Sequence, residues 1–227
     1  MIKSMKNLTL FERCLWGGSV LALILVFSMG TNRDWCTLAA SLIGVTALIF
    51  VAKGDVLGQI LTIVFSLFYA VISYRFRYLG EMITYLGMTA PIALLSTITW
   101  IRNPYAEREV KVRRLKAHHW IWLTLATIAA TGLFYFVLKA CDTPNLLFST
   151  ISIATSFSAS ALTMLRSPYY AIAYAANDVV LIVLWVLATL SDASFLPMVL
   201  CFVIFLVNDL YGFRNWRAMH RRQQTID

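Results

Sequence analysis

The sequence predicts an all-α polytopic membrane protein, and three observations support this fold class. Of the 227 residues, 60% are hydrophobic and only 13% are charged, whereas soluble domains are nearer half apolar and a quarter charged. The mean hydropathy is +0.74. The apolar residues also gather in runs of roughly 20, the length that a helix needs to cross a bilayer. A soluble enzyme, a disordered chain and a small disulfide scaffold are therefore excluded.

Eight segments are predicted to span the membrane. The first follows basic residues and lacks a small-x-small cleavage site, so we expect an uncleaved helix. Pro91 is expected to kink the fourth segment, and a polar, basic link over residues 102–119 precedes the fifth. In order, the segments are Phe11–Met29, Trp35–Val51, Val56–Ser73, Met82–Ile101, Trp120–Leu138, Leu146–Leu165, Tyr169–Leu190 and Phe195–Phe213.

The distribution of positive charge predicts the orientation. If the N-terminus is inside, 15 of the 19 Lys and Arg residues lie on the inner side of the eight segments and four lie outside. This positive-inside bias predicts a multi-pass plasma-membrane protein with both termini in the cytoplasm. The net charge of +8 is therefore assigned to orientation in the lipid bilayer, and no nucleic acid partner is expected.

Short matches indicate an internal repeat. Trp100–Asn103 ends the fourth segment and Gly212–Asn215 ends the eighth, with their arginines 112 positions apart. Lys53-Gly54 opens the third segment and Arg166-Ser167 opens the seventh, 113 positions later. Two three-helix units separated by one linker helix would run in the same direction, as parallel repeats do in SWEET-like carriers. Binding sites in such folds lie near the midplane, between the repeats.

These matches divide the chain into five parts. Residues 35–103 and 146–216 are predicted as the two three-helix repeats, and residues 104–140 as a basic cytoplasmic loop followed by the linker helix. Residues 1–30 form an additional N-terminal helix, and residues 217–227 form a basic cytoplasmic tail. The predicted architecture is therefore three plus one plus three helices, with one extra helix at the N-terminus.

The seventh segment carries a stripe of polar and aromatic side chains. Tyr170, Tyr174, Asn177, Asp178 and Trp185 recur at steps of three and four and share one helical face. Amide and carboxyl groups between aromatic rings suit a flat ligand with polar edges. Alternatively, Tyr170 and Trp185, near the helix ends, are interfacial belt residues.

Polar residues in three other segments are further candidates. Gln59 and Tyr69 share a polar face of the third segment, which either lines a pathway or joins helices by hydrogen bonds. Asn208 is predicted inside the apolar slab of the eighth segment as a ligand contact. Glu81 and Tyr85 are predicted to close the outer mouth, unless Glu81 pairs with a nearby arginine. The small residues of the sixth segment predict a close-packing face, with ligand contact as the less favoured alternative.

The sequence contains no motif for catalysis or for a metal ion. It lacks H-E-x-x-H, G-x-S-x-G and Walker-type patterns, so neither a cofactor nor enzymatic activity is expected. Two other classes remain open at this stage. A membrane enzyme acting on lipid-linked substrates would use Asp178 and Asp209 as its acid and base, and a structural subunit would use its buried amides only for packing.

Several motifs resemble those of the PnuC family of bacterial vitamin transporters. The resemblance runs from Trp35 to Trp216 and rests on four stretches, Ala52–Gly54, Tyr69–Tyr74, Gly80–Met82 and Asn208–Trp216. The family pattern Trp-x-x-Trp-x-x-x-Asn falls here on Tyr170, Ala173 and Asn177. The amide is kept but both indoles are absent, which bears on the substrate more than on the fold.

The resemblance implies a SWEET-like fold, a homotrimer and facilitated diffusion. The implied substrate is nicotinamide riboside, taken up as vitamin B3 for NAD biosynthesis, or thiamine, riboflavin or a deoxynucleoside. A cytoplasmic kinase would trap the substrate by phosphorylating it. Under this hypothesis Asn177, Asn208 and Gln59 bind polar groups, while Tyr174, Trp185 and Tyr69 stack on the ring or gate it.

Overall fold

The computed structural model describes residues 8–29, 35–75, 79–106, 109–143, 145–191 and 196–225. In these residues, eight helical spans are long and apolar enough to cross a membrane, which confirms the multi-pass helical class. The elements are α2 (Leu10–Met29), α3 (Trp35–Ala52), α4 (Val56–Arg75), α5 (Leu79–Thr84), the π-helix η1 (Tyr85–Thr89), α6 (Ala90–Ile101), β1 (Pro104–Ala106), β2 (Glu109–Val110), α7 (Ala117–Ala140), α8 (Leu146–Met164), α9 (Tyr170–Ser191) and α10 (Leu196–Gln224).

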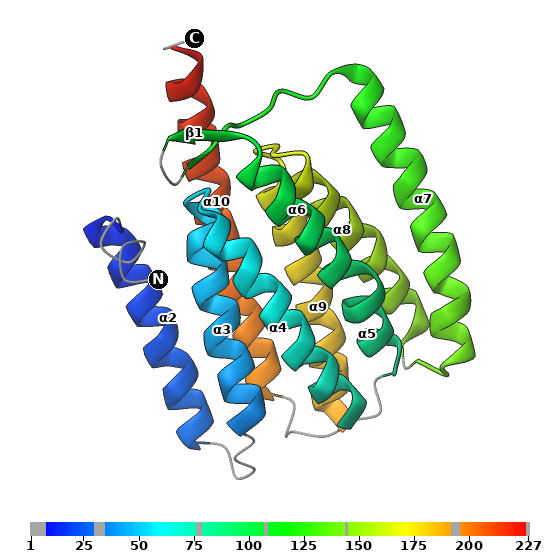
Figure 1. The fold of residues 1–227 in the computed structure, drawn as a ribbon. Coiled ribbons are helices and arrows are strands. Elements are labelled where there is room, and N and C mark those ends of the chain that lie inside the picture. Colours follow the sequence, from blue (N-terminus) through cyan, green and yellow to red (C-terminus); the bar gives the residue numbers. More distant parts are fainter. Residues whose placement is uncertain are drawn as a thin grey trace.

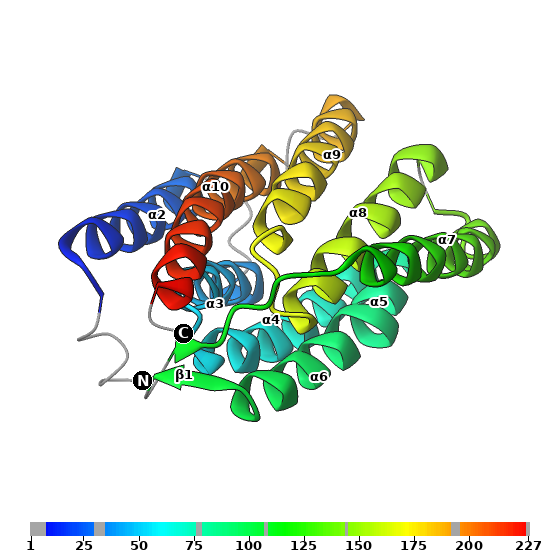
Figure 2. The same cartoon turned by 90° about the horizontal axis from the view of Figure 1, so that it is seen from above.

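The helices form a closed ring with two helices outside it (Figure 1). Going round, α3 packs on α4, α4 on α6, α6 on α8, α8 on α9, α9 on α10, and α10 on α3. Helix α2 lies outside against α3 and α10, and α7 lies outside against α8. Seen from above, α2 and α7 occupy opposite sides of the bundle (Figure 2). The ring therefore contains helices from both predicted repeats.

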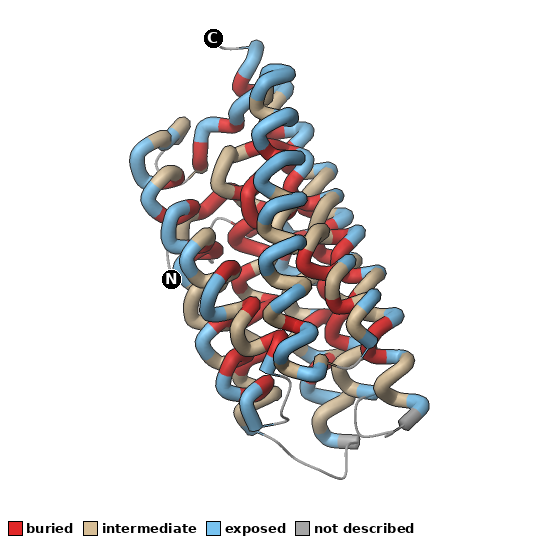
Figure 3. Tube along the Cα trace, turned by 90° about the vertical axis from the view of Figure 1, so that its right-hand side faces the viewer, coloured by how far each residue is buried: buried red, intermediate tan, exposed pale blue. Residues whose placement is uncertain are grey.

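Burial follows this arrangement. Buried residues run through the interior, behind α7, which is mostly exposed (Figure 3). Apolar side chains such as Ile128, Leu133 and Phe136 of α7 are 63 to 69% exposed. In a membrane these side chains face lipid, because lipid tails are as apolar as they are.

The fourth span differs from the single kinked helix that the sequence predicts. It begins at Leu79, three residues before the predicted start, and is interrupted by η1 between α5 and α6. Pro91 lies in the first turn of α6, but Thr89 and Ala90 before it are already helical. Its missing amide hydrogen and its ring therefore disturb the backbone hydrogen bonds of the preceding turn, where η1 lies. The irregularity therefore precedes the proline. Such π-helical turns are frequent at functional sites.

The turn between α3 and α4 is tightly built. Gly54 adopts a positive φ of 71°, which glycine tolerates because it has no Cβ. The Asp55 carboxylate then accepts a hydrogen bond from the Leu57 amide at 2.9 Å and caps α4. A Cβ on Gly58 would lie 2.4 Å from the backbone nitrogen of Val51, so the two helices approach more closely here than any side chain permits.

The same turn geometry occurs twice in the chain. Gly54 after α3 and Arg166 after α8 both have a positive φ and are 112 positions apart. Each carbonyl accepts a hydrogen bond from the segment before α7. The Val110 amide donates to Gly54 at 3.1 Å, and the Arg113 amide donates to Arg166 at 2.9 Å. This segment therefore contacts equivalent points of the two halves.

Two buried indoles join the halves reciprocally. Trp100 at the end of α6 donates to the Thr163 carbonyl of α8 at 3.0 Å. Trp216 on α10 donates to the Val51 carbonyl of α3 at 2.9 Å. The two acceptors are again 112 positions apart, and the indole rings pack together with centroids 5.4 Å apart. The end of the bundle near β1 is therefore held by hydrogen bonds that cross between the halves.

The basic loop is packed against the last helix. Gln223 of α10 accepts a hydrogen bond from the Val112 amide at 2.8 Å, and its Nε2 donates to Glu109 at 2.8 Å and to the Val110 carbonyl at 3.1 Å. Arg222 also forms an ion pair with Glu109. Loop and tail, which the sequence treats as separate basic segments, are thus one structural unit.

Candidate functional site

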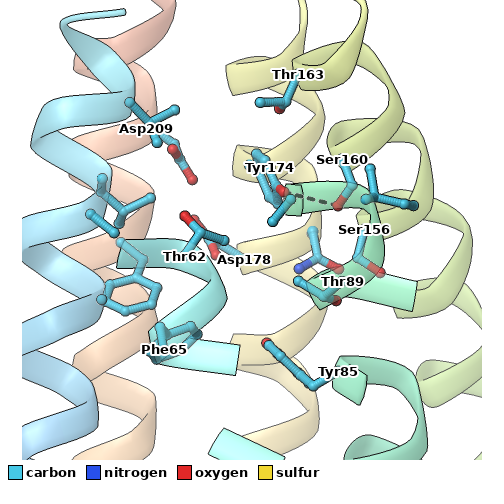
Figure 4. Close-up of a pocket in the computed structure, with 18 of the residues that line it drawn as sticks. Thr62, Phe65, Tyr85, Thr89, Ser156, Ser160, Thr163, Tyr174, Asp178 and Asp209 are labelled. Atoms are coloured by element: carbon cyan, nitrogen blue, oxygen red, sulfur yellow. Dashed lines mark hydrogen bonds between the residues drawn. The ribbon is translucent and has the colours of Figure 1, made fainter. Parts of the chain in front are cut away.

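The ring encloses a polar cavity to which all six of its helical units contribute. Its wall includes Gln59 and Thr62 from α4, Tyr85 from η1, and Asp178 and Asp209 from α9 and α10 (Figure 4). Gly44 and Ala47 of α3 and Thr89 of η1 complete the wall, together with four hydroxyl residues of α8. These four are Ser152, Ser156, Ser160 and Thr163. Both halves of the chain therefore build one site.

The Asn177 amide is oriented by a neighbouring helix. Its Oδ1 accepts a hydrogen bond from Thr155 Oγ1 at 2.8 Å. With Oδ1 facing the Thr155 hydroxyl, the Nδ2 group of the amide is available to donate. Asn177 lies in the cavity wall and is only 6% exposed. It presents a fixed donor to anything that enters.

The charged groups of the cavity wall are all acidic. Asp178 and Asp209 point toward one another from adjacent helices (Figure 4), and Glu81 lies in the same wall. Asp178 Oδ2 is buried and has no hydrogen-bond partner. Among the described residues that line the cavity, none is Lys, Arg or His. A buried carboxyl group without a cation is costly, so the site is built to receive a positively charged or hydrogen-donating group.

Aromatic rings line the cavity at different depths. The Tyr174 hydroxyl and Ser160 Oγ share a hydrogen bond of 2.9 Å (Figure 4). Tyr170, nearer the end marked by β1, packs edge-on against Trp216 with centroids 4.8 Å apart. Tyr85 lies at the other end of the cavity, to the right of Phe65 in the lower part of Figure 4. These rings offer flat surfaces on which a planar ligand stacks.

The stripe predicted on the seventh segment is brought together by the fold. Tyr170, Tyr174, Asn177 and Asp178 all line the cavity, as does Gln59 of the third segment. Glu81 and Tyr85, predicted to close one mouth, lie in the wall beside them. Whether these side chains bind a ligand stays a prediction, but their geometry is compatible with it.

Three predicted contact residues lie elsewhere. Trp185 is packed in an apolar cluster with Leu181 and Phe202, because the stripe turns away from the cavity after Leu181. Asn208 donates to Ser19 Oγ of α2 at 3.2 Å. Tyr69 lies behind Tyr85, with ring centroids 4.2 Å apart. Their positions indicate packing or support roles in place of direct stacking and ligand contact.

The contribution of α8 to the cavity is larger than the sequence predicts. The pattern of small residues favours a packing face over ligand contact, yet Ser152, Ser156, Ser160 and Thr163 line the cavity. Their spacing of three and four residues was visible in the sequence. A row of hydroxyl groups is, however, equally compatible with tight helix packing in a membrane. Thr155, which orients Asn177, had no sequence signal.

A buried polar cavity inside a ring of spanning helices defines a class of protein. Polar and ionisable residues inside a membrane mark a substrate pathway and are otherwise avoided. Among the described residues, no group of three or more His, Cys, Asp or Glu side chains is placed to hold a metal ion. The fold and the site are those of a transporter for a small molecule.

Comparisons with known proteins identify the family. Residues 34–218 match the family model described as nicotinamide mononucleotide transporter. The chain is 26% identical over 208 residues to the nicotinamide riboside transporter PnuC of Neisseria mucosa, covering 88% of this chain and 78% of that one. It is 23% identical over 195 residues to the transporter of the same name from Haemophilus influenzae, covering 85% and 83%.

A solved structure shares the fold. The structure titled "Crystal structure of the Vitamin B3 transporter PnuC" superposes with a TM-score of 0.82 at 24% identity, covering 96% of this chain and 94% of that one. Since the family model matches most of the chain, this protein belongs to the PnuC family. It is a membrane transporter and not an enzyme, which excludes the lipid-linked enzyme that the sequence left open.

Proposed function

We propose that this protein carries nicotinamide riboside, or a closely related nucleoside-like vitamin, into the cell. The observation that carries the proposal is the cavity itself, in which acidic groups face aromatic rings and a fixed amide donor. Nicotinamide riboside combines a planar pyridinium cation with an amide and a hydroxylated sugar. The acids match the cation, the tyrosines match the ring, and the amide and hydroxyl groups match the polar edges.

The charge of the wall ranks the alternative substrates. Thiamine also carries a permanent positive charge, whereas riboflavin and deoxynucleosides are neutral at physiological pH. Removing a cation from water is favourable only if opposite charge compensates it, and Asp178, Asp209 and Glu81 place carboxyl groups in the wall that a bound cation would favour in their ionised form. Nicotinamide riboside is therefore favoured, thiamine is next, and the neutral compounds are disfavoured.

We further propose a SWEET-like arrangement of three plus one plus three helices. The first repeat comprises α3 to α6 and the second comprises α8 to α10, with α7 as the linker and α2 as an addition. The paired left-handed turns at Gly54 and Arg166 support this arrangement, as do the reciprocal bonds of Trp100 and Trp216. Transport would then be a rocking of the two repeats about the cavity, with substrate moving down its gradient.

The charge count supports cytoplasmic termini. With the β1 end of the bundle inside, the basic loop and the α10 tail face the cytoplasm. Tyr85 and Glu81 then lie toward the outer side and serve as the outer gate. A cytoplasmic kinase would trap the substrate as its phosphate, and three copies of the chain would assemble as a homotrimer, as the family resemblance implies.

Ligand binding to the purified protein tests the substrate. Tryptophan fluorescence is titrated with nicotinamide riboside, thiamine, riboflavin and a deoxynucleoside. Quenching by nicotinamide riboside at the lowest concentration is expected. No response to it, together with a clear response to another compound, would overturn the substrate assignment.

A matched pair of variants tests the site. Asn177→Leu removes the donor in the cavity wall and is expected to abolish binding and uptake while leaving expression intact. Asn208→Leu removes a buried amide that lies outside the wall and is expected to keep binding. If both variants lose stability and neither loses binding, the amides serve packing and the site assignment fails.

A further inference from the structure

A second hollow lies at the end of the bundle where α7 begins and α10 ends (Figure 1). Four arginines line it, two from each of two segments that are far apart in the sequence. Arg113 and Arg114 come from the loop before α7, and Arg217 and Arg221 come from α10. Among its described lining residues there is no Asp or Glu. We call this hollow the basic pocket.

Two arginines of the basic pocket contact groups other than acids. Arg113 contacts His119 Nε2 at 2.7 Å, and the Arg217 guanidinium lies over the Phe213 ring at 5.6 Å. Four cations near one hollow repel one another unless an anion compensates them. Arginine is also the side chain whose planar fork matches phosphate oxygens. The basic pocket is therefore complementary to a phosphate group.

An apolar groove continues from the basic pocket along the membrane-spanning helices. Both hollows include Trp120 and Tyr169 in their walls, and these rings meet edge-on with centroids 5.6 Å apart. From there the groove is lined by Leu123 and Ile128 of α7, Leu162 of α8 and Ile172 of α9. Ile128 is 63% exposed, so the groove opens toward the hydrocarbon of the bilayer.

We propose that the basic pocket and the groove together bind one anionic phospholipid. The headgroup phosphate lies among Arg113, Arg114, Arg217 and Arg221, and one acyl chain lies in the groove between α7 and α9. The aromatic pair Trp120 and Tyr169 sits at the level of the lipid headgroups, where such side chains are enriched. Basic pockets between spanning helices on the cytoplasmic side are known to select anionic headgroups.

The geometry favours a lipid over the other occupants. A phosphorylated solute would fill the basic pocket but leave the apolar groove open to the bilayer. A second copy of this chain related by a two-fold axis would bring its own basic pocket toward the first, and like charges oppose that contact. A bound lipid would also brace α7, which packs mainly on α8, against α9 and α10.

The test measures lipid retention by the purified full-length protein in native mass spectrometry. Phosphatidylglycerol is offered against phosphatidylcholine in equal amounts, and preferential retention of phosphatidylglycerol is expected. In Arg217→Gln/Arg221→Gln, affinity for phosphatidylglycerol should fall roughly 30-fold, which converts to about 2 kcal/mol for two surface cations. Arg214→Gln, a cation of the same helix outside the pocket, should retain the lipid.

A second pair of variants tests the groove without changing charge. Thr124→Trp places a ring in the groove and should lower retention of phosphatidylglycerol. Leu125→Trp, beside it on the exposed side of α7 and outside the groove, should not. Because each control introduces the same residue type on the same helix, a general sensitivity of that helix to substitution would appear in the control variants as well.

Three outcomes would overturn the proposal. The first is equal retention of phosphatidylglycerol by the wild type and by Arg217→Gln/Arg221→Gln. The second is displacement of the lipid by millimolar inorganic phosphate, which would make the pocket a site for a soluble anion. The third is retention of phosphatidylglycerol by Thr124→Trp at the wild-type level, which would show that the acyl chain does not occupy the groove. None of these readouts depends on which vitamin the protein carries.

Discussion

Replacing Asp178 by asparagine should raise the stability of the protein and lower its transport activity. Asp178 Oδ2 is buried without a hydrogen-bond partner, and its carboxyl group faces that of Asp209 (Figure 4). An asparagine has nearly the same shape but carries an NH2 group that can donate to the Asp209 carboxylate. The substitution thus removes one of two facing acids and adds a donor.

The size of both effects follows from these contacts. An unsatisfied buried polar atom costs about 1–3 kcal/mol, and about 1 kcal/mol shifts the melting temperature by roughly 2–4 °C in chains of 150–250 residues. The melting temperature of Asp178→Asn should therefore rise by about 2–12 °C. The loss of a charged contact to a cationic substrate, about 1.5–3 kcal/mol, should weaken binding by roughly 10- to 150-fold.

Thermal unfolding of the detergent-purified variant and uptake of labelled nicotinamide riboside into vesicles measure the two effects. Asp55→Asn is the control, because Asp55 is a buried acid that caps α4. Asparagine caps as well as aspartate, so neither quantity should change. A lower melting temperature with unchanged uptake would show that Asp178 is structural and would refute this reasoning.

Three further substitutions test the packing that shapes the cavity, each by thermal unfolding. Gly58→Ala places a Cβ 2.4 Å from the Val51 nitrogen and should cost about 1–3 kcal/mol through backbone displacement. Glu12→Ala leaves Lys53 without its partner at 3.0 Å and should destabilise the protein and make α2 more accessible to protease. Trp216→Phe removes the indole donor of the Val51 carbonyl, which still accepts from the Gly54 amide, at a cost of about 0.5–1.5 kcal/mol.

Matched substitutions at open positions separate these effects from general sensitivity. Gly132→Ala on α7 meets no atom within 4 Å and should leave the melting temperature unchanged or slightly higher, since alanine favours helix. Trp122→Phe, at a side chain that is 69% exposed, should be neutral. If these variants lose as much stability as Gly58→Ala and Trp216→Phe, close packing does not explain the stability that the buried variants lose.

The number and order of the spanning helices followed from local properties. The length of each apolar run, the helix-breaking residues between runs and the number of charges can all be read along the chain. The thickness of the bilayer then sets the minimum length of a run that can span it. The face that carries Asn177 and Asp178 was equally local, because side chains three and four residues apart share one side of a helix. The sequence also predicted a repeat, through two pairs of short matching stretches.

The roles of Trp185, Asn208 and Tyr69 depended on contacts with other helices. All three are polar or aromatic residues spaced so that they share a helical face with other candidates. The spacing does not show, however, whether that face packs against another helix or lines the cavity. The serines of α8 illustrate the reverse case. Small hydroxyl residues pack helices in some membrane proteins and line cavities in others, and only the position of α6 and α9 distinguishes the two.

The sequence alone determined that this chain spans a bilayer, which end of each helix is basic, and which helix faces are polar. These properties depend on the free energy of transferring each segment from water to lipid, a quantity that composition largely sets. The tertiary structure decided that α3 closes the ring against α10, so that acids, amide and tyrosines meet around one cavity. That closure rests on contacts between residues more than 100 positions apart, such as Trp216 with Val51, and no local pattern encodes them.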